Sequence, residues 1–387
     1  MFIELTESQL ALRDELRGYF AGLIAPAERQ AMQNDRHGQA YREIVRRMGR
    51  DGWLGVGWPV EFGGRGLGAV EQQIFVSEAA RADVPLPAVT LQTVGPTLQA
   101  FGTAEQKARF LPAILAGEVH FAIGYTEPGA GTDLAALTTR AVRDGDSYVV
   151  NGQKIFTTGA HDADYIWLAA RTDPDAPRHK GISILITDTS DPGYSWTPII
   201  TCDGAHHVNA TYYSDVRVPV SMRVGEENAG WRLVTTQLNH ERVMLGPAGR
   251  LGALHDRVLR WAAAQTAPDG RPVADQPDAR RVLGRVHATL RVNELLNWQV
   301  AVADSVRIAD ASATKVFASE RVQRLGQELA ELVGRHGDPA DERTAELVRW
   351  LDVQGKRNLV LTFGGGVNEI QRELIATAGL GLPRVPR

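Results

Sequence analysis

The chain has 387 residues, with 42 Lys and Arg against 46 Asp and Glu, a formal net charge of -4, and 43% hydrophobic residues. This composition is typical of a globular protein of about two or three domains and excludes a largely disordered chain. The nearly balanced charge excludes a protein built mainly to coat nucleic acid. The single cysteine, Cys202, excludes an intrachain disulfide framework and a multi-cysteine metal cluster.

Neither end of the chain predicts export or membrane attachment. No apolar run approaches the roughly 20 residues that a membrane-spanning helix needs. The first residues, MFIELTESQL, lack the basic and apolar regions of a secretion signal, and the last, LPRVPR, match no prenylation or peroxisomal signal. We therefore expect a soluble cytoplasmic protein that neither inserts into a membrane nor binds nucleic acid.

Residues 1–120 are predicted to form a helical domain. Thr6 and Gln9 have the spacing of a capping box, and Leu10, Leu16 and Phe20 follow at near-helical spacing. The same periodicity predicts further helices at about residues 40–49, 70–81, 97–101 and 104–116.

Residues 121–222 are predicted to form a β-domain and residues 223–387 a second helical domain. In the β-domain, β-branched and aromatic runs alternate with Asp144-Gly145 and Asn151-Gly152, which are hairpin signals. In the last domain, helical periodicity covers about residues 231–265, 279–306, 311–335 and 341–361, with a loop at 267–278. The expected fold class is α+β, mostly α.

Two glycine-containing segments could bind a cofactor. The glycines at 63–68 follow no clear strand and lack both a Walker lysine and G-x-G-x-x-G spacing, so a surface loop is predicted there. The segment YTEPGAGTD at 125–133 suits a phosphate or the edge of a heterocycle, but a tight turn is an equally good interpretation. In the strand at 152–158, Phe156, Thr157 and Thr158 could stack on a ring and bond its edge, although a half-buried strand is the simpler interpretation.

Taken together, these segments resemble the acyl-CoA dehydrogenase family, whose signatures read close to YTEPGAGSD and GxKxWIT. The segments DVRVP at 215–219, GW at 230–231 and GGGVNEIQR at 364–372 agree with the family in order and spacing. The resemblance covers nearly the whole chain. It implies a flavin-dependent enzyme with a helical N-terminal domain, a middle β-domain and a C-terminal four-helix domain, with FAD and an acyl-CoA bound between them.

The resemblance also implies particular flavin contacts. Tyr125 and Thr126 would contact the isoalloxazine ring, and Thr132 the pyrophosphate. Phe156 would stand where the family usually has a tryptophan, and Thr158 would bond near flavin N5. The complete set of expected FAD-binding residues is Gly124, Tyr125, Thr126, Thr132, Phe156, Thr157, Thr158, Val367 and Glu369.

The catalytic base is expected at an unusual position. Many members carry it just before the Gly-Thr of the C-terminal motif, where this chain has Gly365, which cannot abstract a proton. A minority arrangement places the base in an x-E-R-x pattern on a helix, which Glu241 and Arg242 match. Glu241 would remove the α-proton while hydride leaves the β-carbon, and burial should raise its pKa toward neutrality. Asn239 and Arg242 would orient Glu241 or hold the CoA arm, and Gly365 with Gly366 would contact the thioester.

Part of the family's FAD site is missing from the sequence. Members complete each site across a dimer interface with an R-x-x-F-G segment and a Q-x-x-G-G turn, which here read WAAAQTAPDG at 261–270 and ELVGR at 331–335. The chain thus closely resembles the base-bearing subunit of bacterial α2β2 steroid side-chain acyl-CoA dehydrogenases. That resemblance implies a second, divergent subunit as partner and 3-oxo-4-pregnene-20-carboxyl-CoA as substrate in cholesterol catabolism. It also implies electron-transfer flavoprotein or a similar acceptor.

Three other interpretations remain open: a homo-oligomeric dehydrogenase of short branched acyl-CoAs, an acyl-CoA oxidase, and a non-catalytic scaffold subunit. The intact loop at 125–133 and Glu241 argue against the scaffold. No metal site is expected, because His206 and His207 are adjacent and would point to opposite faces of a strand.

Overall fold

The computed structural model describes residues 4–32, 36–244, 246–303 and 307–384, without the side chains of 238–244. By packing, the chain divides into two compact units. One comprises Leu23–Gly68 and Leu86–Glu241, and the other comprises Met1–Gly22, Ala69–Pro85 and Arg242–Arg387. We call them the sheet unit and the bundle unit.

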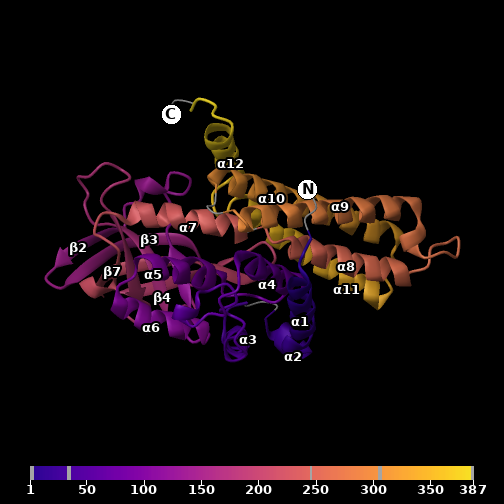
Figure 1. Cartoon of the computed structure of the whole chain (residues 1–387), viewed down its shortest axis with the longest axis horizontal. Helices are drawn as coiled ribbons and strands as arrows, with labels where there is room; N and C mark the ends of the chain where they lie inside the picture. The colour runs from indigo at the N-terminus through magenta and orange to yellow at the C-terminus, as the bar shows by residue number, and fades with distance from the viewer. Residues whose placement is uncertain (1–3, 33–35, 245, 304–306, 385–387) are drawn as a thin grey trace. The chain divides into compact units, whose positions relative to one another are not determined.

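The elements run from helices to strands and back to helices, which confirms the α+β, mostly α class (Figure 1). The α-helices are α1 Glu7–Leu23, α2 Pro26–Ala31, α3 Gln39–Arg50, α4 Ala69–Arg81, α5 Gly95–Phe101, α6 Ala104–Leu115, α7 Gly230–Met244, α8 Ala248–Ala264, α9 Pro277–Ala301, α10 Ile308–His336, α11 Glu342–Asn358 and α12 Asn368–Leu374. The strands are β1 Phe121–Gly124, β2 Arg140–Asp144, β3 Ser147–Thr158, β4 Tyr165–Arg171, β5 Ile182–Asp188, β6 Tyr194–Ile200, β7 His206–Pro219 and β8 Arg223–Val224. Single turns of helix occur at Val60–Phe62, Val89–Val94, Leu134–Ala136, Val220–Met222, Val273–Asp275, Leu359–Thr362 and Ile375–Gly379.

The strands of the sheet unit form a mixed sheet in the order β6-β7-β3-β2-β4-β5-β8, and β1 pairs in parallel with β4. Strand β4 is buried along its middle, with Trp167 and Leu168 inaccessible to solvent. The middle of the β4 sequence is a continuous apolar run, as is typical of a strand that is covered on both faces of its sheet. The end of β1 leads directly into the segment at 125–133.

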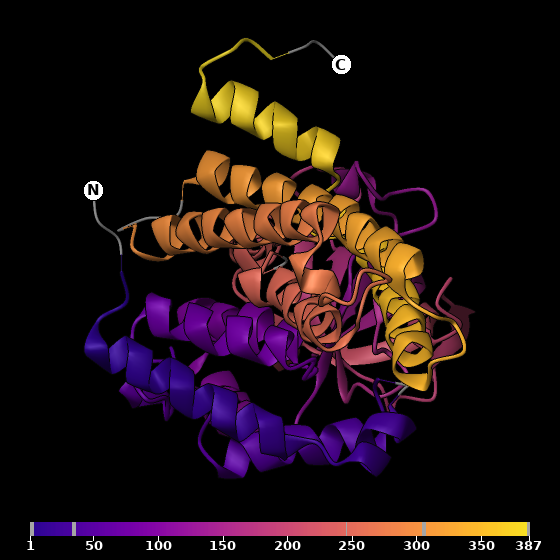
Figure 2. The same cartoon turned by 90° about the vertical axis from the view of Figure 1, so that its right-hand side faces the viewer.

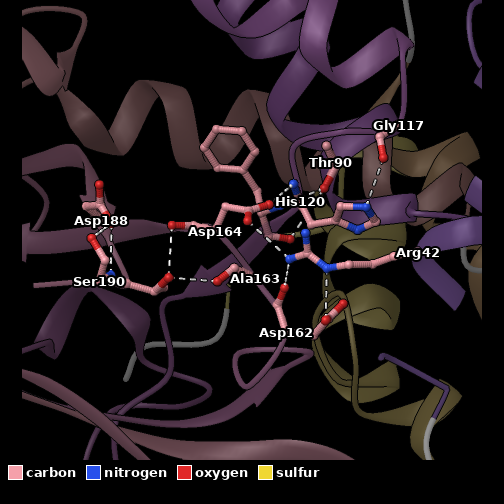
Figure 3. A network of polar contacts seen from close by, with 11 residues as sticks. Arg42, Thr90, Gly117, His120, Asp162, Ala163, Asp164, Asp188 and Ser190 are labelled. Carbon is pink, nitrogen blue, oxygen red and sulfur yellow. Dashed lines mark hydrogen bonds and ion pairs between the residues drawn. The ribbon is translucent and has the colours of Figure 1, made fainter. Parts of the chain in front are cut away.

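Ion pairs attach helix α3 to the sheet within the same unit (Figure 3). The Nε of Arg42 donates to Asp162 Oδ1 at 2.9 Å, and its Nη2 donates to Asp164 Oδ1 at 3.2 Å. Asp164 in turn accepts from the backbone N–H of His120, just before β1, at 2.8 Å. This network fixes where β1 begins, and hence where the segment that follows it lies.

The bundle unit is built on the long helices α8, α9, α10 and α11, which pack side by side (Figures 1 and 2). Leu254, Val258, Val286, Leu329 and Val333 lie in one buried apolar cluster. Among the described residues, no helix is both long and apolar enough to cross a bilayer.

Two sequence predictions about the elements are wrong. Asn151-Gly152 forms no turn but lies within β3, at a shift of register against β7. There, Asn151 exchanges hydrogen bonds with Asp215, whose positive φ of 54° bends β7, and a Cβ at Gly152 would lie 2.5 Å from Thr139 Oγ1. The single helix expected over residues 231–265 is two helices, α7 and α8, because Pro247 cannot donate a helical hydrogen bond.

The other elements follow the predictions closely. The Thr6–Gln9 capping box forms, with the Gln9 N–H donating to Thr6 Oγ1 at 3.3 Å and the Thr6 N–H to Gln9 Oε1 at 3.0 Å. At Asp144-Gly145 the chain leaves β2, whose last residue is Asp144, and turns into β3, and the two strands pair as an antiparallel hairpin. The glycines at 63–68 lie outside regular strands and α-helices, as predicted.

Candidate active site

The segment Tyr125–Asp133, which we call the TEPG loop, leaves the sheet at the end of β1. Glu127 and Ala130 close its turn by exchanging backbone hydrogen bonds of 3.0 and 3.1 Å. Tyr125 is buried, Thr126 is half-buried, and Thr132 is exposed on the outer limb. The loop therefore presents hydroxyls and backbone groups at its surface while its base stays within the sheet unit.

A buried ion pair holds the TEPG loop to strand β3. Glu127 Oε1 accepts from Lys154 Nζ at 2.8 Å and from the Thr139 N–H at 2.8 Å, and Oε2 accepts from the Thr138 N–H at 2.7 Å. Lys154 Nζ also donates to the Tyr125 carbonyl at 3.1 Å. Burial alone would raise the pKa of Glu127, but the Lys154 ammonium and these hydrogen bonds lower it to about 2. Glu127 is therefore a structural anion and not a proton acceptor near neutral pH.

Strand β3 presents an aromatic side chain beside this loop. The Ile155 N–H donates to the Thr126 carbonyl at 2.8 Å. This hydrogen bond places β3 against the TEPG loop, next to Phe156. At a shift of register, Phe156 takes a positive φ of 58° and is 61% exposed. Thr157 is buried and Thr158 exposed, and the Thr157 Oγ1 has no hydrogen-bond partner in the described part of the chain. A positive φ in a bulky residue is costly, and such strain is found mainly at functional sites.

Helix α7 carries the predicted base. The backbone of α7 is described through Met244, but the side chains of Asn239, Glu241 and Arg242 lie outside the described residues. One turn earlier, the buried Gln237 accepts hydrogen bonds from the Tyr125 hydroxyl and from Trp167 Nε1, the latter at 3.3 Å. Positions 237 and 241 share a helix face, because residues four apart are neighbours. Gln237, on the same buried face of α7 as Leu233 and Val234, thus joins this helix to the TEPG loop.

In the bundle unit, the glycine turn before α12 is held by a buried lysine. Gly365 and Gly366 have φ values of 63° and 90°, which glycine adopts without strain. Lys315 Nζ donates to the Gly366 carbonyl at 2.8 Å and to Asn368 Oδ1 at 2.7 Å. Val367 is half-buried and Glu369 exposed. Lys315 fixes the shape of the turn in which the predicted thioester contacts, Gly365 and Gly366, lie.

At the other end of the bundle unit, side chains of the unit form hydrogen bonds and ion pairs with one another. Trp261 is buried, and its Nε1 donates to Thr344 Oγ1 at 2.9 Å. Asp278 accepts from Arg335 Nη1 and from His336 Nε2, both at 2.9 Å. We call residues 261–278 with 331–336 the bundle end. The described residues contain no cluster of His, Cys, Asp or Glu that could hold a metal ion.

Family models match three consecutive parts of the chain. The N-terminal, middle and C-terminal domains of acyl-CoA dehydrogenase match residues 6–118, 122–216 and 228–380. Acyl-CoA dehydrogenase FadE29 of Mycobacterium tuberculosis is 69% identical over 388 residues, covering 100% of both chains. The chain belongs to the acyl-CoA dehydrogenase family. It is therefore a flavin-dependent oxidoreductase of CH–CH bonds, and its cofactor is FAD.

Solved acyl-CoA dehydrogenases share the whole fold. The ChsE4-ChsE5 complex from Mycobacterium tuberculosis contains a chain with a TM-score of 0.90 and 49% identity, covering 100% of both chains. A steroid acyl-CoA dehydrogenase called Tcur3481-Tcur3483 contains a chain with a TM-score of 0.91 and 49% identity, again over 100% of both. FadE26 of Mycobacterium tuberculosis is likewise 49% identical over 402 residues, with complete coverage. Similarity at this level shows one acyl-CoA dehydrogenase fold from end to end.

The described residues of this acyl-CoA dehydrogenase fit a flavin ring. Phe156 offers an exposed aromatic face, and Thr157 a buried hydroxyl that no described residue satisfies. A buried polar group without a partner costs free energy, which a ligand's polar edge can recover. The geometry therefore suits a planar heterocycle with polar edges next to β3.

Sequence reasoning missed three residues that support this site. Lys154 was visible as the lysine of the GxKxWIT-like signature, but its partner Glu127 lies 27 residues earlier in the chain. Lys315 had a weak signal, as a charged residue spaced four and three positions from Ala311 and Ala318, which are buried on the same face of α10. Gln237 gave no signal beyond its spacing from Glu241.

Proposed function

We propose that this chain is the base-bearing subunit of a heteromeric acyl-CoA dehydrogenase that oxidises a steroid CoA thioester with a short α-methyl-branched side chain. The observation that carries the proposal is the glycine turn: Gly365 occupies the usual base position, and α7 carries Glu241 instead. The similarity to one chain of the Tcur3481-Tcur3483 steroid enzyme and of the ChsE4-ChsE5 complex supports the substrate class and the mixed assembly. We infer 3-oxo-4-pregnene-20-carboxyl-CoA as the substrate, in cholesterol side-chain degradation.

Several residues of the chain have separate roles in the proposed α,β-dehydrogenation. Bound FAD supplies the hydride acceptor, flavin N5. Glu241 would take the α-proton, the backbone N–H of Gly365 would polarise the thioester oxygen as negative charge develops on it, and Gly366 would contact the substrate. Asn239 and Arg242 orient the base or hold the CoA arm.

The TEPG loop and β3 would hold the flavin. Tyr125 and Thr126 would contact the ring, Phe156 would stand against it, and Thr158 would bond near N5. Thr132 would bind the pyrophosphate. The remaining assigned contacts are Gly124, Thr157, Val367 and Glu369.

A second, divergent acyl-CoA dehydrogenase subunit would supply what the bundle end lacks. Arg335 and His336 are engaged by Asp278, and Trp261 is part of the core, so these residues are committed within the chain. The exposed Glu331 stands where a glutamine would bind the cofactor, and a carboxylate would repel the diphosphate. We propose an α2β2 assembly in the cytoplasm that passes electrons to electron-transfer flavoprotein or a similar acceptor. We also propose domain limits of 1–120, 121–222 and 223–387.

The base assignment is tested by Glu241→Gln in the purified flavin-containing complex. The variant should keep its yellow colour but lose flavin reduction by substrate in anaerobic rapid mixing, by about 10²-fold or more. Glu342→Gln, at an exposed glutamate on α11, is the matched control and should reduce at the wild-type rate. Normal bleaching of the Glu241→Gln complex would remove Glu241 from the mechanism.

The substrate class is tested by steady-state kinetics on the same complex. The value of kcat/KM for 3-oxo-4-pregnene-20-carboxyl-CoA should exceed those for isobutyryl-CoA and octanoyl-CoA at least about tenfold, a difference of roughly 1.4 kcal/mol. A preference for the simple thioesters would instead support a dehydrogenase of short branched acyl-CoAs. Rapid reaction of the reduced complex with oxygen would identify an oxidase.

A further inference from the structure

Five histidines of the sheet unit gather in one network of ring contacts. The rings of His161 and His206 are stacked with their centroids 4.0 Å apart, and the His37 ring lies 5.6 Å from that of His161 and 6.4 Å from that of His207. His37 also contacts a tyrosine ring that in turn contacts His120. All but His120 are half-buried, so water can reach them. Because histidine is the side chain that ordinarily changes charge between about pH 5 and 8, this network is sensitive to pH.

A buried asparagine joins the network to the end of β3 that would hold the flavin. Asn209 lies on β7 and is inaccessible to solvent. Its Nδ2 donates to the Thr157 carbonyl at 3.2 Å and lies 3.0 Å from His161 Nδ1, and its Oδ1 lies 2.7 Å from His206 Nε2. The register of β3 against β7 shifts between Lys154 and Thr157, which disrupts the strand pairing there. The Asn209 side chain therefore holds β3 where its pairing with β7 is irregular.

The positions of the protons in this network follow from its hydrogen bonds. A backbone carbonyl can only accept, so the group of Asn209 that faces Thr157 must be the NH2. The second hydrogen of that NH2 faces His161 Nδ1, which must therefore be unprotonated, and the amide oxygen must accept from His206 Nε2. The network is complete only while His161 is neutral, because a proton on its Nδ1 would set two donors against each other.

The turn that carries His161 is held in place on both sides. The Asp162 and Ala163 N–H groups both donate to the Gly159 carbonyl at 3.0 Å, and the Gly159 N–H donates to the His207 carbonyl at 2.9 Å. Gly159 has a φ of 70°, and a Cβ at this position would lie 2.8 Å from His37 Nδ1. The turn has little room to move, so a repulsion between His161 and Asn209 would be relieved by displacing Asn209.

The charged and titratable groups around His161 come from several segments of the sheet unit. They are Asp162 and Asp164 on its own turn, His37 and Arg42 at and before α3, His206 and His207 on β7, and Asp203, which accepts from His207 at 3.3 Å. Strand β6 contributes only the uncharged Trp196, with ring centroids 5.7 Å apart. Arg42 pairs with both Asp162 and Asp164 (Figure 3). Two carboxylates around one guanidinium favour a positive charge on a neighbouring imidazole.

We propose that Asn209 and His161 form a pH-sensitive clasp on β3: while His161 is neutral, Asn209 holds the carbonyl of Thr157, and protonation of His161 releases that carbonyl and weakens FAD binding. The inference rests on the proposed function, in which Phe156, Thr157 and Thr158 contact the flavin. FAD and the proton then oppose each other, so FAD affinity falls as the pH drops.

The test measures the Kd of FAD in the flavin-containing complex at about pH 7.5 and 5.5, on either side of the ordinary pKa of histidine, from the flavin fluorescence released on dilution. For the wild type, the Kd should rise about tenfold at the lower pH, a change of roughly 1.4 kcal/mol. His161→Gln keeps an acceptor for Asn209 without a titrating group. Its Kd should match the wild type at the higher pH and change less than about twofold between the two. Far-UV circular dichroism checks that both proteins stay folded.

A second variant and a control separate this role from a structural one. His161→Lys places a permanent donor against Asn209, so its Kd should already be raised about tenfold at the higher pH. It also decides the question if His161→Gln does not fold. His287→Gln changes an exposed histidine on α9 and should keep the pH dependence of the wild type. His120 is unchanged in every variant, so its own titration affects them equally.

The outcomes distinguish the clasp from the flavin contacts on which it rests. Equal pH dependence in the wild type and His161→Gln overturns the clasp, as does an FAD affinity of the wild type that does not change with pH. Thr158→Val removes a predicted flavin contact and should raise the Kd about threefold to tenfold at the higher pH. An unchanged Kd in Thr158→Val would overturn that flavin contact itself, whereas a raised Kd with equal pH dependence overturns only the clasp.

Discussion

The TEPG loop and the bundle end both contain ion pairs, but they bury them to very different degrees. In the TEPG loop, the side chains of Glu127 and Lys154 are 5% and 0% exposed. In the bundle end, the side chain of Arg335, which pairs with Asp278, is 62% exposed. Buried charges tolerate only one arrangement, whereas exposed pairs contribute little and can be replaced.

This difference gives a physical reason why, under the proposed function, one chain would keep half of a cofactor site and lack the other half. The loop that would hold the ring depends on interior charges, so its shape is part of the fold of the sheet unit. The bundle end owes its fold to apolar packing around Trp261 and Val333, and its surface charges are free to change. Loss of cofactor contacts there costs the chain itself little stability.

The largest expected effect comes from removing one charge of the buried pair. Lys154→Met leaves Glu127 buried without its cation, which should lower the free energy of unfolding by about 3–5 kcal/mol. Denaturant unfolding of the complex measures this loss. Lys356→Met, which breaks the exposed pair with Asp352, is the control and should cost about 0–1 kcal/mol.

The double variant sharpens that test. Adding Glu127→Gln to Lys154→Met removes the uncompensated charge, so part of the lost stability should return. Equal losses for Lys154→Met and Lys356→Met would contradict the contrast between buried and exposed pairs.

A smaller effect is expected from acid, through His120 in the sheet unit. Burial, reinforced by the nearby Arg42, lowers the pKa of His120 to about 4 from its ordinary 6.5. Between these values the unfolded chain binds a proton that the folded chain does not, so stability falls as the pH drops from 6.5 to 4. The loss from this residue should reach about 3 kcal/mol at most.

His120→Gln removes this titration while keeping a side-chain donor for the Gly117 carbonyl, which His120 contacts at 3.3 Å. Unfolding free energies measured at several pH values should fall less steeply for the variant between pH 6.5 and 4. Identical slopes for both proteins would show that His120 does not drive the acid loss.

The smallest effect is expected at the bundle end. Asp278→Asn weakens the contacts with the exposed Arg335 and the half-buried His336, and should cost only about 0–1 kcal/mol. Thermal unfolding of the variant complex measures it. A loss as large as that of Lys154→Met would mean that the bundle end is as dependent on charge as the TEPG loop.

Contiguous signals made most of the fold predictable from the sequence. The TEPG loop, Phe156 and the glycine turn are short motifs, and the helices have clear periodicity. The Asn151-Gly152 prediction was wrong because its turn chemistry was overridden by Asp215, a residue 64 positions away that shapes the bulge. The break before α8 had a local sequence signal, Gly246 followed by Pro247. The prediction missed it because the helical periodicity continues on both sides of these two residues.

The supporting contacts of the site were beyond sequence reasoning because each joins distant segments. Gln237 meets Trp167 across 70 residues, and Lys315 meets Asn368 across 53. An amide or lysine within a helix has no pattern that names such a partner. The roles of Glu241, Asn239 and Arg242 stay predictions, since their side chains lie outside the described residues.

The central claim is that this chain holds the ring half of a flavin site that a different subunit must complete. One lost charge-assisted contact to the diphosphate is worth about 1.5–3 kcal/mol, or roughly one to two orders of magnitude in FAD affinity. The most direct measurement is the FAD content and activity of the chain purified alone and after co-expression with a partner that carries the arginine and the Q-x-x-G-G turn. Alone, the chain should be flavin-poor and inactive; with the partner, it should elute as α2β2 with about one FAD per heterodimer. Stoichiometric FAD and full activity in the isolated chain would contradict the account.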